Sequence, residues 1–401
     1  MNKLTIMKSK FILRFIAVGI IAVTTFSFSL QTGNRLKTIN LLRPEGTELS
    51  ISEIAGDIQY IPLATDSLLA NIMKVIYSEG VYFVKDNKSK FLRFDENGRL
   101  LNQIGRRGKG PGEYLYVSDF VIHPVTRNIF VSGGKPDQIL AYSPEGKFLK
   151  PIPLTIKYVT SMGISDKNLF LFYFDGAQHI EKNMELIDTE GSILKSYTNK
   201  YKFEKGRAMV GFASECLMYP VEGKLHFKEI FSDTLFYLDG EKMIPEMVLN
   251  SEDRQFTPEI RTKVIKEYSA DPRGSSESLV KSVIQNNLLE TRNYLFYSYG
   301  YDRKVRMLIY NKSTGKKTEI DSKTGIKNDW DGGPNIQLKM NKDDNTVFSW
   351  VNAFELKQYV ASETFKNSTP KFLEKKKELE KLANSLNEND NPILVLVKMK
   401  E

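Results

Sequence analysis

The sequence predicts an all-β fold: a six-bladed β-propeller with helical insertions in the fifth and sixth blades, its ring closed by the N- and C-terminal strands. Three observations support this prediction. A hairpin unit recurs along the chain, glycine turns mark it at a nearly constant period, and the last copy lacks a strand that a stretch near the N-terminus can supply. At 401 residues, 41% of them hydrophobic, the chain is long enough to bury the core of such a ring.

The hairpin unit is clearest in its first copy. Three apolar runs, at 81–84, 90–94 and 100–104, are separated by polar residues, and Asn97-Gly98 precedes the third run. Asn-Gly between apolar runs predicts a type I′ turn, because both central positions of that turn need a positive φ.

Six apolar runs begin successive copies of this unit, each after a turn-prone pair. They start at Val81, Ile129, Leu169, Leu225, Tyr294 and Val347. The first five copies contain turn glycines, spaced 48, 45, 49 and 75 residues apart, at Gly98, Gly146, Gly191, Gly240 and Gly315. A period in the mid-forties is typical of a four-stranded propeller blade, which needs neighbours to cover both of its faces. A β-sandwich with glycine turns is the alternative, since short strands fit it too.

Two stretches interrupt the repeat with helix-like patterns. The long spacing marks an insertion at about residues 253–289, where Thr257 is a capping residue and Pro258 suits a first helical turn. The sixth unit turns helical over about residues 353–388, with apolar positions on one face. Insertions between blades often carry binding surfaces, although a solvated decoration explains these two equally well.

The last unit is one outer strand short. It has strand-like runs at 335–340, 346–351 and 393–397. Residues 56–63 resemble the predicted outer strand at 146–154. We therefore expect residues 56–63 to pair with 393–397, so that the propeller spans residues 48–401 and both chain ends share one sheet.

The N-terminal segment is typical of an export signal. Four cations accompany an apolar stretch at 15–26, and small residues alternate up to Ser29. About twelve residues is short for a membrane span, which needs about 20. We predict a signal peptide over residues 1–29 and a linker over 30–47. The alternative is an uncleaved anchor with the body on the same, exported side.

The cysteine count and the net charge argue against lipid-anchored, disulfide-linked and nucleic-acid-binding proteins. Cys216 is the only cysteine, so lipid attachment after the signal has no acceptor and no intrachain disulfide can form. The net charge of +8 includes four cations in the N-terminal segment, Lys3, Lys8, Lys10 and Arg14. Without them 53 basic residues face 49 acidic ones, a weakly basic and well-mixed balance that argues against nucleic-acid binding.

The glycine-rich loop at residues 105–114 is the first candidate site. Its four glycines can aim backbone N–H groups at a ligand, and Arg106, Arg107 and Lys109 can hold an anion. It is not a Walker A loop, because no Lys-Ser/Thr pair and no helix follow the glycines. We favour the alternative, a rigid corner between blades in which Glu113 pairs with an arginine and Tyr114 packs.

A second glycine-rich stretch lies at residues 328–334. Asp329 and Asp331 can ligate a hard cation such as calcium, although Asx turns explain them equally well. We expect Trp330 to be exposed and able to stack on a sugar or a peptide. Asp119 is the third metal candidate, for a cation on the propeller axis.

The remaining reactive residues give weak signals. His123, His179 and His226 lie in separate repeats, and their spacing does not require a zinc site. Cys216 is more typical of a buried apolar residue than of a nucleophile. The sequence has no Gly-x-Ser-x-Gly elbow and no His-Glu-x-x-His motif.

With its repeats laid out, the chain resembles a group of exported six-bladed β-propeller proteins from anaerobic Gram-negative gut bacteria, relatives of the NHL-repeat propellers. The likeness rests on QIGRRGKGPGEY (103–114), SDF (118–120), ILAYSPEGKF (139–148), DGGP (331–334) and NPIL (391–394). It runs from about Ile51 to the C-terminus. The resemblance implies the fold and a periplasmic or cell-envelope location, and it implies no chemistry because the group has no settled activity. Many members look like lipoproteins, and this chain lacks their cysteine.

We therefore predict a non-enzymatic, exported, monomeric propeller that binds a glycan or protein partner through inter-blade loops, with no cofactor unless calcium binds. The candidate contacts are Arg106, Arg107, Lys109, Glu113, Tyr114 and Trp330. No nucleic acid is expected, and a membrane only through an uncleaved N-terminal segment. The alternative is a metal-assisted hydrolase, lactonase or lyase with a cation on the axis, for which the ligand candidates are Asp119, Asp329 and Asp331. Three or more carboxylate or imidazole groups meeting at the axis would favour the enzyme.

Overall fold

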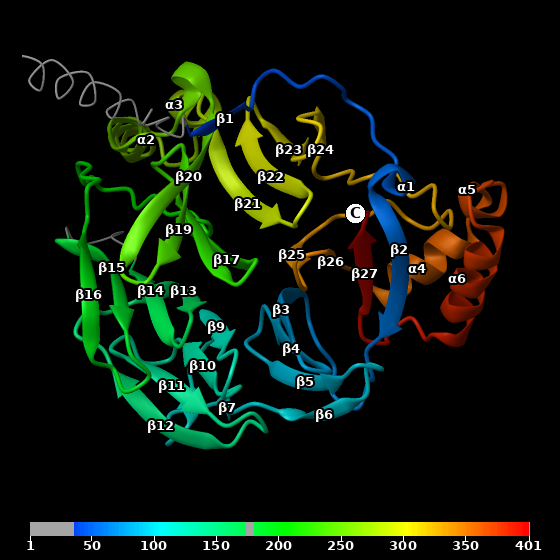
Figure 1. Ribbon diagram of the computed structural model, residues 1–401, viewed down its shortest axis with the longest axis horizontal. Coiled ribbons are helices and arrows are strands. Elements are labelled where there is room, and N and C mark those ends of the chain that lie inside the picture. The colour runs from blue at the N-terminus through cyan, green and yellow to red at the C-terminus, as the bar shows by residue number, and fades with distance from the viewer. Residues whose placement is uncertain (1–35, 174–179, 401) are drawn as a thin grey trace, which may run out of the picture. The chain divides into compact units, whose positions relative to one another are not determined.

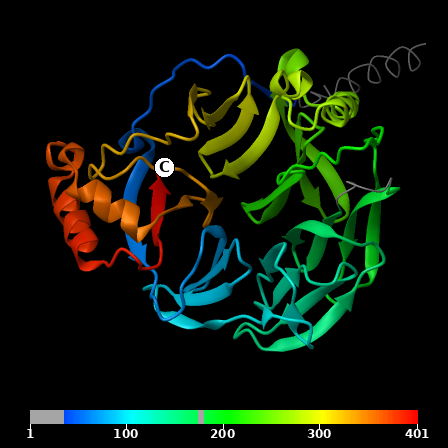
Figure 2. The ribbon, with the colours of Figure 1, turned by 180° about the vertical axis from the view of Figure 1, so that it is seen from behind.

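A computed structural model describes residues 36–173 and 180–400 of the chain. The stretch Thr38–Glu401 forms one compact unit, in which six antiparallel sheets stand in a ring (Figures 1 and 2). The predicted signal peptide and His179 lie outside the described residues. The six innermost strands contact one another in a closed circle, β3 to β9, β13, β17, β21, β25 and back to β3. The predicted six-bladed propeller is confirmed.

The first three sheets follow the chain in order, each running from the centre of the ring outward. The first holds β3 (Ile72–Ser78), β4 (Val81–Asp86), β5 (Phe91–Asp95) and β6 (Leu100–Gln103). The second holds β9 (Asp119–Ile122), β10 (Ile129–Ser132), β11 (Gln138–Tyr142) and β12 (Phe148–Pro153). The third holds β13 (Val159–Ser165), β14 (Asn168–Tyr173), β15 (Lys182–Ile187) and β16 (Ile193–Thr198). A short parallel pair, β7 (Arg106–Arg107) and β8 (Glu113–Tyr114), lies between the first two sheets.

The fourth and sixth sheets also take strands from the N-terminal part of the chain. The fourth holds β17 (Cys216–Val221), β18 (Lys224–Glu229), β19 (Thr234–Asp239) and β20 (Lys242–Asn250), with β1 (Lys37–Asn40) outermost. The fifth holds β21 (Ile284–Glu290), β22 (Tyr294–Tyr301), β23 (Lys304–Asn311) and β24 (Lys317–Asp321). The sixth holds β25 (Met340–Asn341), β26 (Thr346–Val351), β27 (Ile393–Met399) and β2 (Ala55–Pro62).

The helices lie where the repeat is interrupted. The 3₁₀ turn η1 (Glu252–Arg254), α2 (Pro258–Ala270) and α3 (Glu277–Val280) connect the fourth sheet to the fifth. In the sixth blade, α4 (Ala353–Ala361), α5 (Glu363–Lys366) and α6 (Leu373–Ser385) connect β26 to β27. A short helix, α1 (Ile51–Ile54), precedes β2. Among the described residues, no helix has both the length and the apolar character needed to cross a membrane.

Apolar side chains fill each space between neighbouring sheets. Six separate clusters of buried residues correspond to the six pairs of adjacent sheets. Cys216 is buried in the cluster between the third and fourth sheets, and burial raises the pKa of its thiol well above the usual value. Each blade is thus covered on both faces, which is the physical reason for the repetition.

The ring is closed by the two ends of the chain, as predicted. Strand β27 lies between β26 and β2, and Val397 is opposite Val347 on one side and Ile58 on the other. The outer strand β2 therefore depends on β27 for its place in the sheet (Figure 1).

The segment that leads to β2 covers the outer edges of sheets four and five. Strand β1 pairs with β20, although we predicted residues 30–47 as a linker. The chain then passes β24, where Gly46 bridges to Thr318, and reaches α1. An outer strand presents unpaired backbone groups, and covering it blocks pairing with other chains. We call residues 38–62 the N-terminal belt.

All five predicted turn glycines have a positive φ, between +56° and +98°. At Gly98 a Cβ atom would lie 2.1 Å from the carbonyl oxygen of Pro62, so no other residue fits. The predicted type I′ turn is wrong, because Asn97 is not among the residues with positive φ. Instead, the Asp95 carboxylate accepts the N–H groups of Asn97 and Arg99, at 2.9 and 2.8 Å. This capped turn leaves only the glycine in the left-handed region.

Candidate functional site

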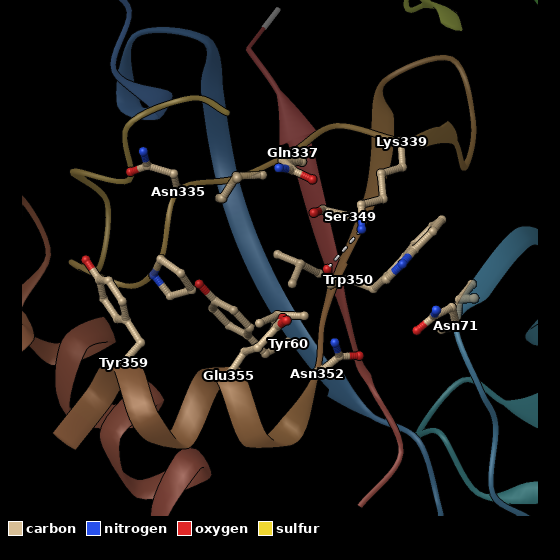
Figure 3. A pocket seen from close by; sticks show the side chains of 15 residues that line it. Tyr60, Asn71, Asn335, Gln337, Lys339, Ser349, Trp350, Asn352, Glu355 and Tyr359 are labelled. Carbon is tan, nitrogen blue, oxygen red and sulfur yellow. Dashed lines mark hydrogen bonds between the residues drawn. The ribbon is translucent and has the colours of Figure 1, made fainter. Parts of the chain in front are cut away.

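A cavity of about 660 Å³ opens in the sixth blade (Figure 3). We call it the sixth-blade pocket. Its walls are β2, β26, β27, helix α4, the loop before β25 and the stretch just before β3. The pocket forms because helix α4 of the insertion lies against the sixth sheet, which contains β2 and β27.

Several polar side chains reach this pocket without a hydrogen bond or ion pair to any other described residue. Among them are Asn71, Asn335, Asn352 and Glu355. Asn352 is the N-cap residue of α4, yet its side chain makes no capping bond. Polar groups that face a cavity unpaired are available to a ligand, because no protein contact must be broken first.

Three aromatic residues, Tyr60, Trp350 and Tyr359, contribute to the apolar surface of the pocket. Trp350 is half-buried, and its ring lies 4.2 Å from the Nζ atom of Lys339. Tyr60 donates its hydroxyl to Oδ2 of Asp331 at 2.8 Å. Burial, with Asp331 as the second cause, raises the pKa of Tyr60 well above its usual value. Tyr60 is therefore a neutral donor that is already engaged, whereas the Trp350 ring can contact a ligand.

Lys339 is the only lysine or arginine among the residues that line the pocket. Its backbone N–H donates to the Phe348 carbonyl at 2.8 Å, and its carbonyl accepts from Asn287 of the fifth blade at 2.8 Å. Burial lowers the pKa of Lys339 to about 8, against a smaller raising effect of Glu355. The pocket thus contains one partly desolvated ammonium group at a fixed position.

The glycine-rich loop forms the rigid corner that we favoured. Arg106 pairs with Glu113 (Nε to Oε1, 2.5 Å), and the Gly110 N–H donates to Oε2 of Glu113 at 2.8 Å. The Gly110 and Arg106 contacts, in that order, lower the pKa of Glu113. Tyr114 is buried and donates to the Ile104 carbonyl at 2.8 Å. Arg106, Arg107 and Lys109 are exposed.

The acidic residues of the 328–334 loop accept hydrogen bonds from protein donors. Asp329 accepts from the backbone N–H of Ser52 at 3.0 Å and from its hydroxyl at 2.6 Å. Asp331 accepts from Asn328, Tyr60 and the Gly333 N–H, at 2.7 to 2.8 Å. Burial is the main reason that the pKa of Asp331 lies above its usual value. Calcium at these carboxylates stays a prediction, and the ion would have to displace these donors.

Trp330 is buried, and its predicted exposure is wrong. Only 7% of Trp330 is accessible, and its ring packs on Phe372 with 4.3 Å between the ring centroids. The backbone N–H of Phe372 also donates to the Trp330 carbonyl at 3.0 Å. The connection between α5 and α6 folds back over the loop and covers the ring. The half-exposed tryptophan is Trp350, which the sequence analysis did not single out.

Asp119 ties three blades together near the centre of the ring. Its Oδ1 atom pairs with Nζ of Lys74 on β3 at 2.5 Å, and Oδ2 accepts the N–H of Met162 on β13 at 2.8 Å. These partners differ from those of Asp329 and Asp331. Among the described residues, the three predicted metal ligands therefore do not form one site.

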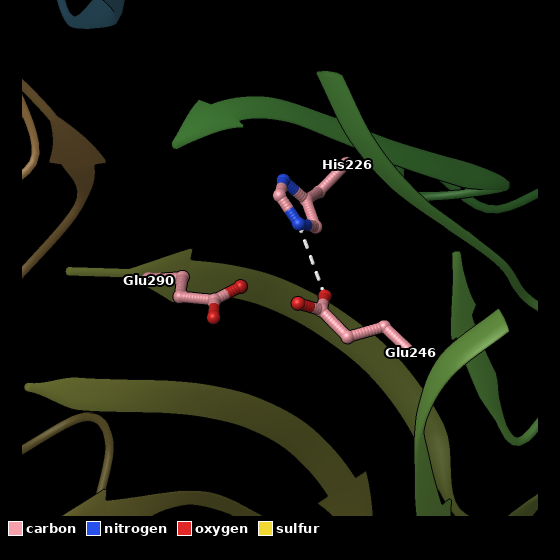
Figure 4. A group of neighbouring side chains, drawn as sticks. All are labelled: His226, Glu246 and Glu290. Carbon is pink, nitrogen blue, oxygen red and sulfur yellow. Dashed lines mark ion pairs between the residues drawn. The ribbon is translucent and has the colours of Figure 1, made fainter. Parts of the chain in front are cut away.

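One other group of side chains has the composition of a metal site (Figure 4). His226 on β18, Glu246 on β20 and Glu290 on β21 bring one ligand atom each within 4.8 Å of the others. Glu246 occupies a β-bulge, where the pairing of β19 with β20 shifts by one residue. The bulge turns its side chain toward the neighbouring sheet. This group lies between the fourth and fifth sheets, and sequence spacing gave no sign of it.

Each carboxylate of this cluster already has a partner in the protein. Lys312 forms an ion pair with Glu290, which also accepts the Tyr219 hydroxyl at 2.7 Å. His226 pairs with Glu246 through Nε2 and Oε2 at 3.0 Å. Burial raises the pKa of Glu246, but the pairing with His226 and the nearby lysines outweigh it, so that pKa is lower than usual. The other described histidine, His123, accepts two turn N–H groups at 3.1 Å and lies elsewhere.

We expect that this group binds neither zinc nor calcium, so that about a tenfold excess of either ion shifts the melting temperatures of the parent protein and of Glu246→Gln equally, to within about 1 °C. The reason is that the Lys312 ammonium occupies the position in which a cation would pair with Glu290. Thermal denaturation with added metal or with chelator measures this, and the Glu246→Gln variant is the control. A metal-dependent rise in melting temperature that is lost in Glu246→Gln would contradict the expectation.

Six sheets, a ring closed by strands from both chain ends, and a pocket against a helical insertion define a six-bladed β-propeller with an elaborated last blade. The chain belongs to the family described as "Domain of unknown function (DUF4934)", whose model matches residues 36–398. No curated protein matches the chain in sequence.

Two solved structures have a similar fold over nearly the whole chain. One is a Bacteroides fragilis protein named as an exported protein, with 18% identity, a TM-score of 0.66, and coverage of 91% of this chain and 99% of that one. The other is a member of the DUF4221 family from Bacteroides vulgatus, with 12% identity, a TM-score of 0.52, and coverage of 89% and 99%. At these identities the likeness shows the fold alone.

Proposed function

We propose that this protein is a non-enzymatic, exported propeller that binds a glycan in the sixth-blade pocket. One observation carries the proposal: a cavity of about 660 Å³ onto which unpaired amide and carboxylate groups and a half-exposed tryptophan converge. Export is supported by the composition of residues 1–29, with cations ahead of a short apolar stretch. The Bacteroides fragilis neighbour, whose name calls it exported, agrees with this location.

The lining of the pocket suits a sugar better than a flat protein surface. Asn71, Asn335 and Asn352 offer amide donors and acceptors, which match the hydroxyl groups of a sugar ring. The Trp350 ring offers an apolar face of the size of a sugar ring. A concave site with a few placed polar groups is typical of small-ligand recognition. Arg107 and Lys109 on the inter-blade loop remain the candidates for contact with a protein partner.

The pocket lacks the groups that glycoside hydrolysis needs. Glu355 is the only carboxylate among the lining residues, whereas hydrolysis requires a pair on either side of the bond. The metal-assisted alternative has one three-ligand group among the described residues, and Lys312 already pairs with one of its two carboxylates, Glu290. Binding is therefore the function that these side chains support best.

Glycan-array screening of the purified protein, followed by calorimetry on the hits, tests the proposal. We expect Trp350→Ala and Asn335→Ala to weaken binding by about tenfold or more, because each removes a ligand contact. Asn335 is exposed, so its variant should keep the stability of the parent protein. The double variant Arg107→Ala/Lys109→Ala should bind the glycan normally. Loss of binding in the loop variant alone, or no glycan bound at all, would overturn the proposal.

A further inference from the structure

The ammonium group of Lys339 has no counter-ion among the residues that the structure describes. No described carboxylate lies within 4.0 Å of its Nζ atom, and its one hydrogen bond, to the Trp350 carbonyl, is long at 3.4 Å. The nearby lysine on the same stretch, Lys342, differs: it pairs with Asp343 at 3.0 Å. Half-buried Lys74 and Lys312 likewise have carboxylate partners.

An unpaired ammonium group at the wall of a cavity is costly to desolvate. The Trp350 ring, 4.2 Å away, offsets part of this cost through a cation–π contact. The part of the desolvation cost that is not offset lowers the pKa of Lys339, which burial brings to about 8. A ligand carboxylate beside Nζ would restore a partner and raise that pKa again. The position of Lys339 thus favours an anionic group at this end of the pocket.

The rest of the pocket is suited to neutral polar groups. The titratable groups that face Lys339 are Glu355 and Tyr359 on α4 and Tyr60 on β2. Glu355 is exposed and is not paired with Lys339, so solvent screens its repulsion of an anion. Burial raises the pKa values of Tyr60 and Tyr359, so both remain neutral hydroxyls. Asn335 stands on the side of the pocket away from the Lys339 ammonium (Figure 3).

We propose that the ligand is an acidic sugar, whose carboxylate pairs with Lys339 while its hydroxyl groups bind the pocket amides. This inference rests on the proposed function, and it names the substrate class of the same site. The geometry that carries it is one cation without a described counter-ion, an aromatic ring beside it, and unpaired amides in the same pocket, one of them, Asn335, on the opposite side.

Matched sugar pairs test the inference by calorimetry: methyl glucuronide against methyl glucoside, and methyl galacturonide against methyl galactoside. We expect at least one acid to bind about tenfold more tightly than its neutral partner, because only the acid can form a charge-assisted hydrogen bond with the Lys339 ammonium. Lys339→Gln should abolish this preference but keep the weaker neutral binding, and Lys339→Arg should keep the preference. Lys342→Gln, outside the pocket, is the matched control and should behave as the parent protein.

A pH series gives a second readout that a purely structural role would not produce. The preference for the acid should be full below about pH 8 and fall above it, as Lys339 loses its proton. Equal binding of acid and neutral sugars, or a preference that survives in Lys339→Gln, would overturn the inference and leave the proposed function standing. Failure of every sugar to bind would overturn both.

Discussion

Replacement of Arg261 with alanine is expected to lower the free energy of unfolding by about 3–5 kcal/mol. Arg261 on α2 forms a bidentate ion pair with Glu215, with both N–O distances at 2.9 Å. The two residues are only 1% and 6% exposed. The guanidinium also lies 4.5 Å from the ring of Phe203 and 5.6 Å from that of Phe231. Without the arginine, Glu215 would remain buried with an uncompensated charge.

An exposed ion pair on the same helix provides the control. Lys266 pairs with Glu204 at 2.6 Å, and both side chains are mostly exposed. Lys266→Ala should therefore cost less than about 1 kcal/mol. Urea denaturation at pH 7 measures both variants. Equal losses for Arg261→Ala and Lys266→Ala would show that the buried pair does not hold the insertion to the fourth blade.

The loss of stability caused by Arg261→Ala should also depend on pH. Burial already raises the pKa of Glu215, even against the opposing effect of Arg261, and removal of Arg261 takes that opposing effect away. A carboxyl group whose pKa is higher in the folded than in the unfolded protein stabilises the fold fully below its unfolded pKa of 4.5. That stabilisation is lost as the pH rises through the folded-state pKa. The difference between Arg261→Ala and the parent protein should therefore be smaller at pH 5 than at pH 8.

Replacement of Val397 with asparagine is expected to cost about 3–4 kcal/mol. Val397 is 0% exposed in the middle strand of the closing sheet, between Val347 and Ile58. An amide at this position would be buried without partners. The next residue of the same strand, Lys398, is exposed, so Lys398→Asn is the matched control and should cost less than about 1 kcal/mol.

Chemical denaturation of the two β27 variants measures this difference. Asparagine is introduced in both variants, and the difference in strand propensity between valine and lysine is at most about 1 kcal/mol, less than the difference expected here. A cost for Val397→Asn no larger than that for Lys398→Asn would mean that β27 adds little to the closing sheet.

The repeat could be predicted because its signals are local. A strand, its turn glycine and the next strand lie within a few tens of residues, and each copy repeats the same pattern. The prediction of a type I′ turn at Asn97-Gly98 was wrong for an equally local reason. The carboxylate of Asp95 caps the turn from two residues before Asn97, so only Gly98 needs a positive φ. A carboxylate caps the corresponding turn of the third sheet in the same way: Asp188 accepts the N–H of Ser192 at 2.8 Å.

The candidate site could not be predicted in the same way, because distant parts of the chain build it. The pocket joins Tyr60, Lys339, Trp350 and Val395, which no local pattern connects. Trp330 stands in an acidic, glycine-rich loop and Trp350 in an apolar strand, yet the insertion that follows them covers the loop tryptophan, through Phe372. The loop at 105–114 was the easier case, since Glu113 lies close enough in sequence to pair with Arg106.

The place of β27 between β26 and β2 governs how the protein can be assembled. Strand β2 is made early and its partner last, with more than three hundred residues between them. Until residue 393 has been delivered, the growing chain carries two strand edges that no neighbour covers, and such edges pair readily with other molecules. An incomplete chain is therefore the species most prone to aggregate, and any factor that assists biogenesis would have to shield these edges until the final strand arrives.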